Sequence, residues 1–230
     1  MIKELRRSLV GSLKYRIEHF VDLEAQNIKL ERQRRALAAT VDLVESSFGR
    51  ARVLYTREAV LRNALAAAGE SQPGLYLEFG VYQGSTINLI ASLIESEVHG
   101  FDSFEGLPEY WREGHEKGEF KVSAPPSVCW NVVLHKGWFC DTLPLFLDEH
   151  IESVRFLHVD CDLYSSTKTI FSALADRLVS GTIIVFDEYF NYPGWQECEY
   201  KAFMEFVSTG RHFEYLAYNC RSEQVAVRLL

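Results

Sequence analysis

Residues 75–86, with the sequence LYLEFGVYQGST, give the clearest indication of the fold of this 230-residue chain. An apolar run from Leu75 to Phe79 meets a turn that contains Gly80 and Gly84, and a helical pattern follows from Ser85 to Ile94. Glycine permits a tight turn and lets a ligand approach the backbone closely. The stretch therefore predicts a strand, a turn and a helix that begin an α/β sheet.

Further apolar runs repeat this strand–helix pattern downstream. They predict strands at Glu97–Phe101, Asn131–His135, Arg155–Val159 and Thr182–Phe186, with helices near Pro144–Glu149 and at Ser165–Leu178. The tail differs, because Phe213–Tyr218 and Gln224–Leu229 flank a turn and predict an antiparallel hairpin. Alternating strands and helices imply an α/β, doubly wound, mostly parallel and Rossmann-like sheet, here of seven strands.

The first 70 residues predict a helical extension before this sheet. Apolar residues recur in steps of three and four from Ile2 to Phe20, as on one face of an amphipathic helix. A second helix is expected at Arg57–Ala68, and the break at Ser71–Gly74 separates the extension, 1–70, from a domain at 71–230. Because the N-terminal helix has no core of its own, we expect it to pack on the domain or on another subunit of a homo-oligomer.

The composition indicates which kinds of partner and which cellular compartment to expect. A net charge of −8 disfavours a nucleic-acid partner, which needs clustered Lys and Arg. The five cysteines are scattered without a Cys-x-x-Cys pair, so reduced thiols in a cytoplasmic protein are expected. Charged residues interrupt the N-terminal apolar stripe, so neither a signal peptide nor a membrane span is expected.

The residues after the first predicted strand favour S-adenosylmethionine (SAM) over a dinucleotide. Gly80 and Gly84 do not have the Gly-x-Gly-x-x-Gly spacing that binds a pyrophosphate. Glu78 suits a cationic ligand, and SAM carries a sulfonium and an ammonium group. The SAM carboxylate can use the helix N-terminus at Ser85 and Thr86. Taken alone, the motif is also compatible with a strand–turn–helix junction that binds nothing.

Two further strand ends fit an adenosine. Asp102 follows the second strand, where a carboxylate can accept hydrogen bonds from both ribose hydroxyls. Gly137 and Trp138 follow the third strand, where an adenine would lie. Trp138 either stacks on the base or belongs to the ordinary core, and the sequence leaves both open.

Four carboxylates follow the fourth and fifth strands. They belong to Asp160, Asp162, Asp187 and Glu188. Neighbouring carboxylates repel one another unless a cation or a shared proton compensates, and Mg²⁺ takes oxygen ligands of this kind. Asp160, Asp187 and Glu188 are therefore candidate metal ligands, with Asp162 as the general base. In the alternative interpretation, Asp162 or Ser165 only caps the helix that follows.

Two segments without strong helix or strand signals carry large aromatic residues. Residues 110–130 contain Trp111 and Trp130, and residues 191–200 contain Tyr192 and Trp195. They are either loops that cover an acceptor or surface loops with aromatic anchors.

Together these motifs resemble the macrocin O-methyltransferase family, class I SAM enzymes that methylate sugar or related hydroxyls in natural-product pathways. The likeness runs from about Tyr55 to Phe206, roughly two-thirds of the chain. It rests on Glu78-x-Gly-Val, on DSFEGLP at 102–108, on DCDLYSST at 160–167 and on an acidic pair 27 residues after Asp160. All four motifs occur in order, each at a predicted strand end.

The resemblance implies a SAM-dependent O-methyltransferase domain at 71–230 that acts on a hydroxyl of a small molecule, a sugar or glycosylated natural product. The residues expected to contact SAM are Glu78, Gly80, Gly84, Ser85, Thr86, Asp102, Ser103, Gly137, Trp138 and Asp160. Asp160, Asp187 and Glu188 match the family's metal positions, and catalysis is expected of Asp162 and Asp160. The family has two aspartates where this chain has Asp187 and Glu188, and the extra methylene can still reach a metal.

Two other functions are compatible with such a sheet. A nicotinamide-dependent oxidoreductase would need the glycine triplet that is missing here. A non-catalytic SAM-binding relative could act as an assembly partner through the N-terminal helix. The retained carboxylates argue against that second function, because a site without catalysis need not keep them.

Overall fold

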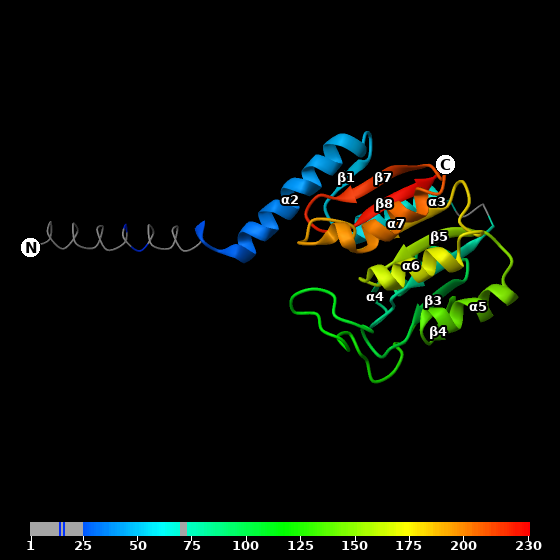
Figure 1. The fold of residues 1–230 in the computed structure, drawn as a ribbon. Coiled ribbons are helices and arrows are strands. Elements are labelled where there is room, and N and C mark those ends of the chain that lie inside the picture. The colour runs from blue at the N-terminus through cyan, green and yellow to red at the C-terminus, as the bar shows by residue number, and fades with distance from the viewer. Residues whose placement is uncertain (1–13, 15, 17–24, 70–72) are drawn as a thin grey trace, which may run out of the picture.

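The computed structural model describes residues 14, 16, 25–69 and 73–230. They form an α/β structure in which helices lie on both faces of one sheet (Figure 1). The apolar residues of the predicted N-terminal stripe, between Ile2 and Phe20, lie outside the described residues. None of the described helices is long and apolar enough to span a membrane.

Within the described residues, eight strands form the sheet, in the order β1-β7-β8-β6-β5-β2-β3-β4. They are β1 (Arg52–Leu54), β2 (Leu75–Phe79), β3 (Val98–Asp102), β4 (Val132–Lys136), β5 (Val154–Val159), β6 (Ile183–Phe186), β7 (Phe213–Asn219) and β8 (Val225–Leu229). All pairs are parallel except those of β8 with β6 and β7, so the doubly wound class and the C-terminal hairpin are confirmed. The expected number of seven strands is wrong, because β1 pairs with β7 and its three residues are too few to show a periodicity.

The described helices are α2 (Ile28–Ser47), α3 (Arg57–Ala68), α4 (Ser85–Ala91), α5 (Phe139–Glu149), α6 (Tyr164–Ala173) and α7 (Glu199–Val207), with a 3₁₀ turn at Trp195–Glu197. The prediction for α3 is confirmed at both ends: the Thr56 hydroxyl accepts a hydrogen bond from the backbone N–H of Ala59, and Gly69 follows with φ +68°. The prediction for α5 began too late, because Pro144 lies inside the helix and not at its start. The predictions for α4 and α6 ran on past their true ends at Ala91 and Ala173.

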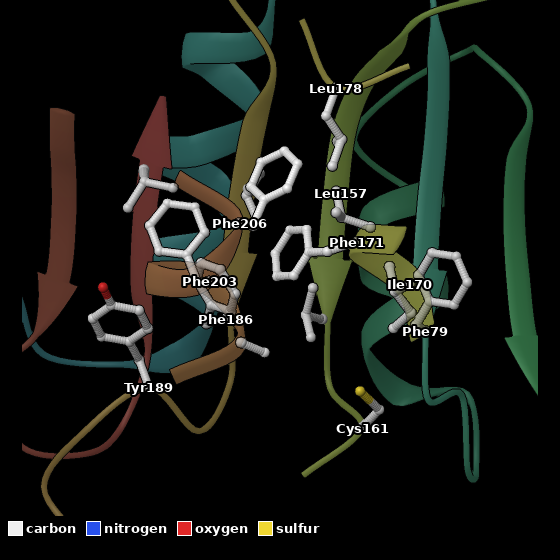
Figure 2. Close-up of a cluster of buried hydrophobic side chains, with 14 of the residues drawn as sticks. Phe79, Leu157, Cys161, Ile170, Phe171, Leu178, Phe186, Tyr189, Phe203 and Phe206 are labelled. Carbon is white, nitrogen blue, oxygen red and sulfur yellow. The ribbon is translucent and has the colours of Figure 1, made fainter. Parts of the chain in front are cut away.

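Alternate residues of the strands supply two separate cores. Leu75, Leu77 and Phe79 of β2 join the core under α5, α6 and α7, whereas Tyr76 joins the core under α3 and α4. In the first core, Phe171 stacks on Phe206 at 4.8 Å between ring centroids (Figure 2). A sheet buried on both faces fixes the strand ends rigidly, and those ends carry the polar residues described below.

The segment before the predicted boundary at residue 70 packs on this same sheet. β1 joins it at the edge, α3 covers one face, and α2 runs outward beyond the β1 edge (Figure 1). At the base of α2, Phe48 stacks on Tyr215 with ring centroids 3.8 Å apart. Further along α2, the Thr40 hydroxyl accepts a hydrogen bond from the backbone N–H of Asn191 at 3.0 Å. A division of the chain at residues 70 and 71 stays a prediction.

Candidate active site

A cavity of about 500 Å³ opens at the carboxyl ends of the parallel strands. The predicted site residues that line it are Gly80, Ser85, Thr86, Asp102, Ser103, Trp138, Asp160, Asp162, Asp187 and Glu188. Glu78, Gly84 and Gly137 do not line it. Contact of each predicted residue with SAM stays a prediction. The volume is within the usual range for a small-molecule site.

The glycine turn after β2 is held against the end of β5. Gly80 has φ +93°, and a Cβ there would lie 1.7 Å from the carbonyl oxygen of Asp160. Any side chain would therefore collide with the backbone as well as strain it. Because of Gly80, the end of β2 and Asp160, a predicted metal ligand, lie together in one wall of the cavity.

Asp102 at the end of β3 fastens the same turn. One carboxylate oxygen accepts the backbone N–H groups of Val81 and Tyr82, both at 2.8 Å, and the other accepts that of Phe104 at 2.7 Å. A carboxylate has about four acceptor positions, so three are in use. Both oxygens that were expected to accept hydrogen bonds from the ribose hydroxyls therefore already accept hydrogen bonds from the turn. The ribose contact stays a prediction.

Glu78 lies beneath the cavity in a buried triad with Thr86 and His158. Its carboxylate accepts the hydroxyl of Thr86 at 3.0 Å and pairs with Nδ1 of His158 at 3.0 Å. Burial alone would lower the pKa of His158, but Asp187 and Glu78 raise it to about 10. The protonated imidazole therefore links the Glu78 carboxylate to Asp187, which lies 3.8 Å from Nε2. Asp187 belongs to a carboxylate row that also contains Asp160, Asp162 and Glu188.

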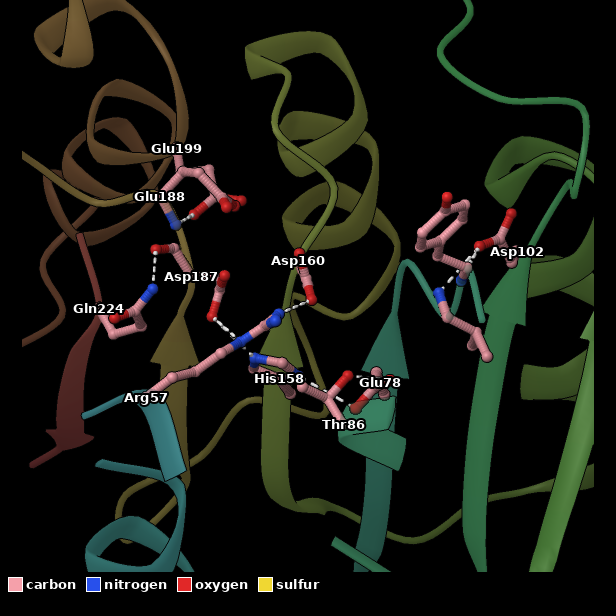
Figure 3. Close-up of polar contacts among 12 residues, drawn as sticks. Arg57, Glu78, Thr86, Asp102, His158, Asp160, Asp187, Glu188, Glu199 and Gln224 are labelled. Carbon is pink, nitrogen blue, oxygen red and sulfur yellow. Dashed lines mark hydrogen bonds and ion pairs between the residues drawn. The ribbon is translucent and has the colours of Figure 1, made fainter. Parts of the chain in front are cut away.

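Arg57, at the first turn of α3, is the feature that sequence reasoning missed. Its guanidinium lies between two predicted metal ligands, paired with Asp160 through Nη2 and with Asp187 through Nε at 2.6 Å (Figure 3). Burial disfavours the charged guanidinium, but Asp160 and Asp187 outweigh it and raise its pKa. The only signal in the sequence was the number of carboxylates that follow β5 and β6, because neighbouring carboxylates need a cation to compensate their charge.

The carboxylates nevertheless outnumber the cations around them. Burial and the charge of Asp187 raise the pKa of Asp160 well above its usual range, whereas His158 and Arg57 lower that of Asp187 in spite of its burial. Burial raises the pKa values of Glu188 and Glu199 well above theirs, with help from the carboxylates nearby. Glu188 Oε2 is buried with no hydrogen-bond partner among the described residues.

The donor set fits a hard divalent cation. Asp160 and Asp187 each offer a carboxylate oxygen within 4.8 Å of the other, and Glu188 has the unpartnered oxygen, whereas the protonated ring of His158 has no free lone pair for a metal. Oxygen-rich sets of this kind suit Mg²⁺. The guanidinium of Arg57, however, lies in the same space, so a metal and Arg57 would compete for Asp160 and Asp187.

Asp162 lies in the cavity in a strained conformation. Its φ of +65° is unusual for any residue except glycine, and asparagine or aspartate tolerates it best. Burial is the main reason that its pKa rises to about 7; Arg112 opposes the rise, and Asp187 and Glu223 add to it. The capping alternative is wrong, because the N-cap of α6 is Leu163 and no side chain caps that helix.

The two aromatic segments differ in their relation to the cavity. Trp111 and Arg112 line it, and the Arg112 guanidinium lies 3.8 Å from the Trp111 ring centroid. Tyr192 and Trp195 are buried beside α7 and do not line it. A role of residues 191–200 in covering an acceptor stays a prediction. Trp130 is 83% exposed.

Comparisons with known proteins agree with this architecture. A family model described as a methyltransferase domain matches residues 77–189, from β2 to just past β6. The solved structure of the calicheamicin methyltransferase CalS11 superposes with a TM-score of 0.61 at 23% identity, covering 86% of this chain and 90% of that one. The O-methyltransferase NovP gives 0.55 at 21% identity, covering 75% and 78%. Residues 77–189 thus match a methyltransferase domain, and the fold is similar to the folds of these solved methyltransferases.

Two curated relatives are similar in sequence. Demethyldecarbamoylnovobiocin O-methyltransferase of Streptomyces niveus is 26% identical, over 58% of this chain and 60% of that protein. The 8-demethyl-8-(2,3-dimethoxy-alpha-L-rhamnosyl)-tetracenomycin-C 4'-O-methyltransferase of Streptomyces olivaceus is 27% identical, over 51% and 53%. The chain thus spans somewhat more than half the length of each relative. Both relatives are named as O-methyltransferases.

Proposed function

We propose that this protein transfers the methyl group of SAM to a hydroxyl oxygen of a glycosylated natural product. The observation that carries the proposal is the cavity in which the Gly80 turn and the buried Asp162 share one space. The names of the two curated relatives, one of which methylates a rhamnosyl group, support a sugar hydroxyl as the acceptor.

The chemistry is a direct displacement. The acceptor oxygen attacks the methyl carbon in line with the leaving sulfur, so a new C–O bond forms as the C–S bond breaks. Holding the two reactants in that line supplies much of the rate. Asp162 accepts the hydroxyl proton, and a carboxyl group with a pKa of about 7 is suited to that role near neutral pH.

Asp160, Asp187 and Glu188 are the residues that would hold a divalent cation. A bound Mg²⁺ would lower the pKa of the acceptor hydroxyl and neutralise part of the carboxylate charge. Arg57 neutralises part of that charge already, and it orients Asp160 and Asp187 toward each other across the cavity wall. SAM binding involves residues that follow β2, β3 and β4, namely Gly80, Ser85, Thr86, Asp102, Ser103 and Trp138.

The proposal is tested by turnover with defined acceptors. Purified protein would be incubated with SAM and a panel of glycosides, their aglycones and catechols, with the demethylated cofactor and the methylated product both quantified. We expect product from glycosides that carry a free sugar hydroxyl. SAM binding without turnover of any class of acceptor would favour the non-catalytic assembly partner. Tight NAD binding without SAM binding would favour the oxidoreductase.

The assembly and compartment are further proposals. α2 exposes Ile28, Leu37 and Val41, which supports packing of the N-terminal region against another subunit. All five cysteines are unpaired, which supports a reducing compartment such as the cytoplasm. Light scattering on the full chain and on a chain without residues 1–45 tests the assembly: two monomers of equal stability would contradict it.

A further inference from the structure

A cluster of imidazoles lies on β3 and β4, apart from the cavity. His99 is the second residue of β3, whereas Asp102, which lines the cavity, is the last. Nε2 of His99 lies 3.3 Å from a carboxylate oxygen of Glu97, and the His150 ring at the end of α5 lies 4.9 Å from the His99 ring. Glu97, His99 and His150 each offer a ligand atom within 4.8 Å of the others.

Hydrogen bonds to the remaining ring nitrogens orient both imidazoles. Nδ1 of His150 lies 2.9 Å from the carbonyl oxygen of Phe146, an acceptor, so this nitrogen carries the proton and Nε2 keeps its lone pair. Nδ1 of His99 lies 3.2 Å from Nε2 of His135 and can donate to it, which leaves Nε2 of His99 free to ligate. Metal-bound histidines in proteins are typically fixed in this way through the second nitrogen.

We propose that Glu97, His99 and His150 bind a divalent transition-metal ion of the Zn²⁺ type. Two imidazole nitrogens and one carboxylate oxygen are a known three-residue ligand set for Zn²⁺, with a fourth position left to solvent. The 3.3 Å between Glu97 and His99 is close to the roughly 3.4 Å that separates two ligand atoms of a tetrahedral Zn²⁺. Glu97 is exposed and His150 is partly exposed, so the ion has a route from solvent.

The electrostatic surroundings agree with a cation. His99 is 4% exposed and lies beside the rings of His135 and His150. Glu97 is next to the ring, and the carboxylates of Glu149 and Glu152 act on the same histidines. The ion would join the segment before β3 to the end of α5, which are 53 residues apart between Glu97 and His150. A site of this kind stabilises the fold without touching the methyl-transfer site.

The test is metal binding to the full-length chain after treatment with a chelator. Calorimetry with Zn²⁺ and visible absorption with Co²⁺ report on the ligand set directly and need no activity. We expect one equivalent to bind, with Co²⁺ bands typical of tetrahedral nitrogen and oxygen ligands and no thiolate charge-transfer band. His150→Gln and Glu97→Gln should each weaken binding at least tenfold. His135→Gln should weaken it about 10–100-fold by releasing the second nitrogen of His99.

The matched control is His212→Gln, which alters an exposed histidine outside the cluster and should leave binding unchanged. Circular dichroism checks that each variant is folded, and His150 and Glu97 are chosen because neither is fully buried. Failure to bind Zn²⁺, or equal binding by the chain with Gln at position 150, would overturn the proposal. The three histidines would then be an aromatic cluster packed around Phe146, whose ring lies 4.1 Å from that of His150.

Discussion

At the ends of β2 and β3, the carboxylate of Asp102 accepts three backbone N–H groups, whereas at the ends of β5 and β6 a row of carboxylates faces too few donors. Figure 3 shows the two regions side by side, with Asp102 apart from the group around Arg57. In the first region, both carboxylate oxygens of Asp102 have hydrogen-bond donors. The second keeps Glu188 Oε2 without a partner and holds several carboxyl groups at raised pKa values.

The difference between the two regions indicates that the first serves cofactor binding and the second serves methyl transfer. A pocket wall made of backbone turns and satisfied hydrogen bonds suits a cofactor that must be held in one position. A wall of crowded carboxyl groups stores electrostatic free energy, and such a group can accept a proton near neutral pH where an isolated aspartate would be a weak base. Substitutions in the first wall should therefore act on SAM affinity, and substitutions in the second on turnover and on stability.

The largest effect is expected for Asp162→Asn. Asparagine keeps the size of the side chain and tolerates the positive φ of this position, so the fold should persist. Turnover should fall about 10²–10⁴-fold, the usual contribution of a general base, with SAM affinity nearly unchanged. Stopped assays of methylated product and calorimetry with SAM measure the two quantities separately.

The pH dependence supplies an independent check on Asp162. Since its pKa is raised to about 7, the ionised base is lost as the pH falls through 7. Activity should rise with pH up to about that value and level off above it, provided that proton removal limits the rate. An Asn variant with unchanged turnover would remove Asp162 from the mechanism.

The next effect is expected for Arg57→Gln, which removes the cation that Asp160 and Asp187 share. We expect the free energy of unfolding to fall by about 2 kcal/mol, less than for a fully buried pair because Arg57 is partly exposed. Urea denaturation measures it. Added Mg²⁺ should recover part of the loss if Asp160, Asp187 and Glu188 bind it. In the absence of Mg²⁺, the Arg57→Gln variant should bind Mn²⁺ more tightly than the unaltered protein does, because no guanidinium competes for the carboxylates.

The same helix offers a matched control in Arg62→Gln. Arg62 pairs with Glu58 at 2.8 Å, but both side chains are about half exposed and one turn apart. Such pairs contribute about 0.3–0.5 kcal/mol. Equal destabilisation by the two variants would mean that Arg57 acts only as a helix residue and not as the counter-ion of the carboxylate row.

These two regions were also predictable to different degrees. The stretch at 75–86 encodes its strand, glycine turn and helix locally, so β2 and the start of α4 agree with the prediction at each residue. Arg57 contacts Asp160 across 103 residues of sequence, and a single arginine at a helix start gives no sign of such a contact. His158 reads as a core residue of its strand, and Glu199 lies in a segment that was expected to be a loop.

In the first region, at the ends of β2 and β3, Asp102→Ala should weaken SAM binding by about 1–3 kcal/mol, the scale of a charge-assisted hydrogen-bond pair. The substitution removes the acceptor for Val81, Tyr82 and Phe104, so the turn loses its shape as well as any ribose contact. Calorimetry with SAM and with adenosine tests it. Unchanged affinity for both would show that the turn is held by Gly80 and its packing alone.

The smallest effect is expected for Trp138→Leu, which tests whether the indole binds SAM or only begins α5. Trp138 lines the cavity with 41% of its surface exposed, so a partner such as an adenine can still cover it. Stacking of a base on an aromatic side chain contributes about 1–3 kcal/mol, and a half-covered ring should be at the low end. We therefore expect the SAM dissociation constant to rise about fivefold. Trp130→Leu is the control, because Trp130 is 83% exposed and outside the cavity lining, and its loss should change nothing. If both variants bind SAM as tightly as the unaltered protein, Trp138 is a surface residue at a helix start, and the adenine must be held by other groups of the wall.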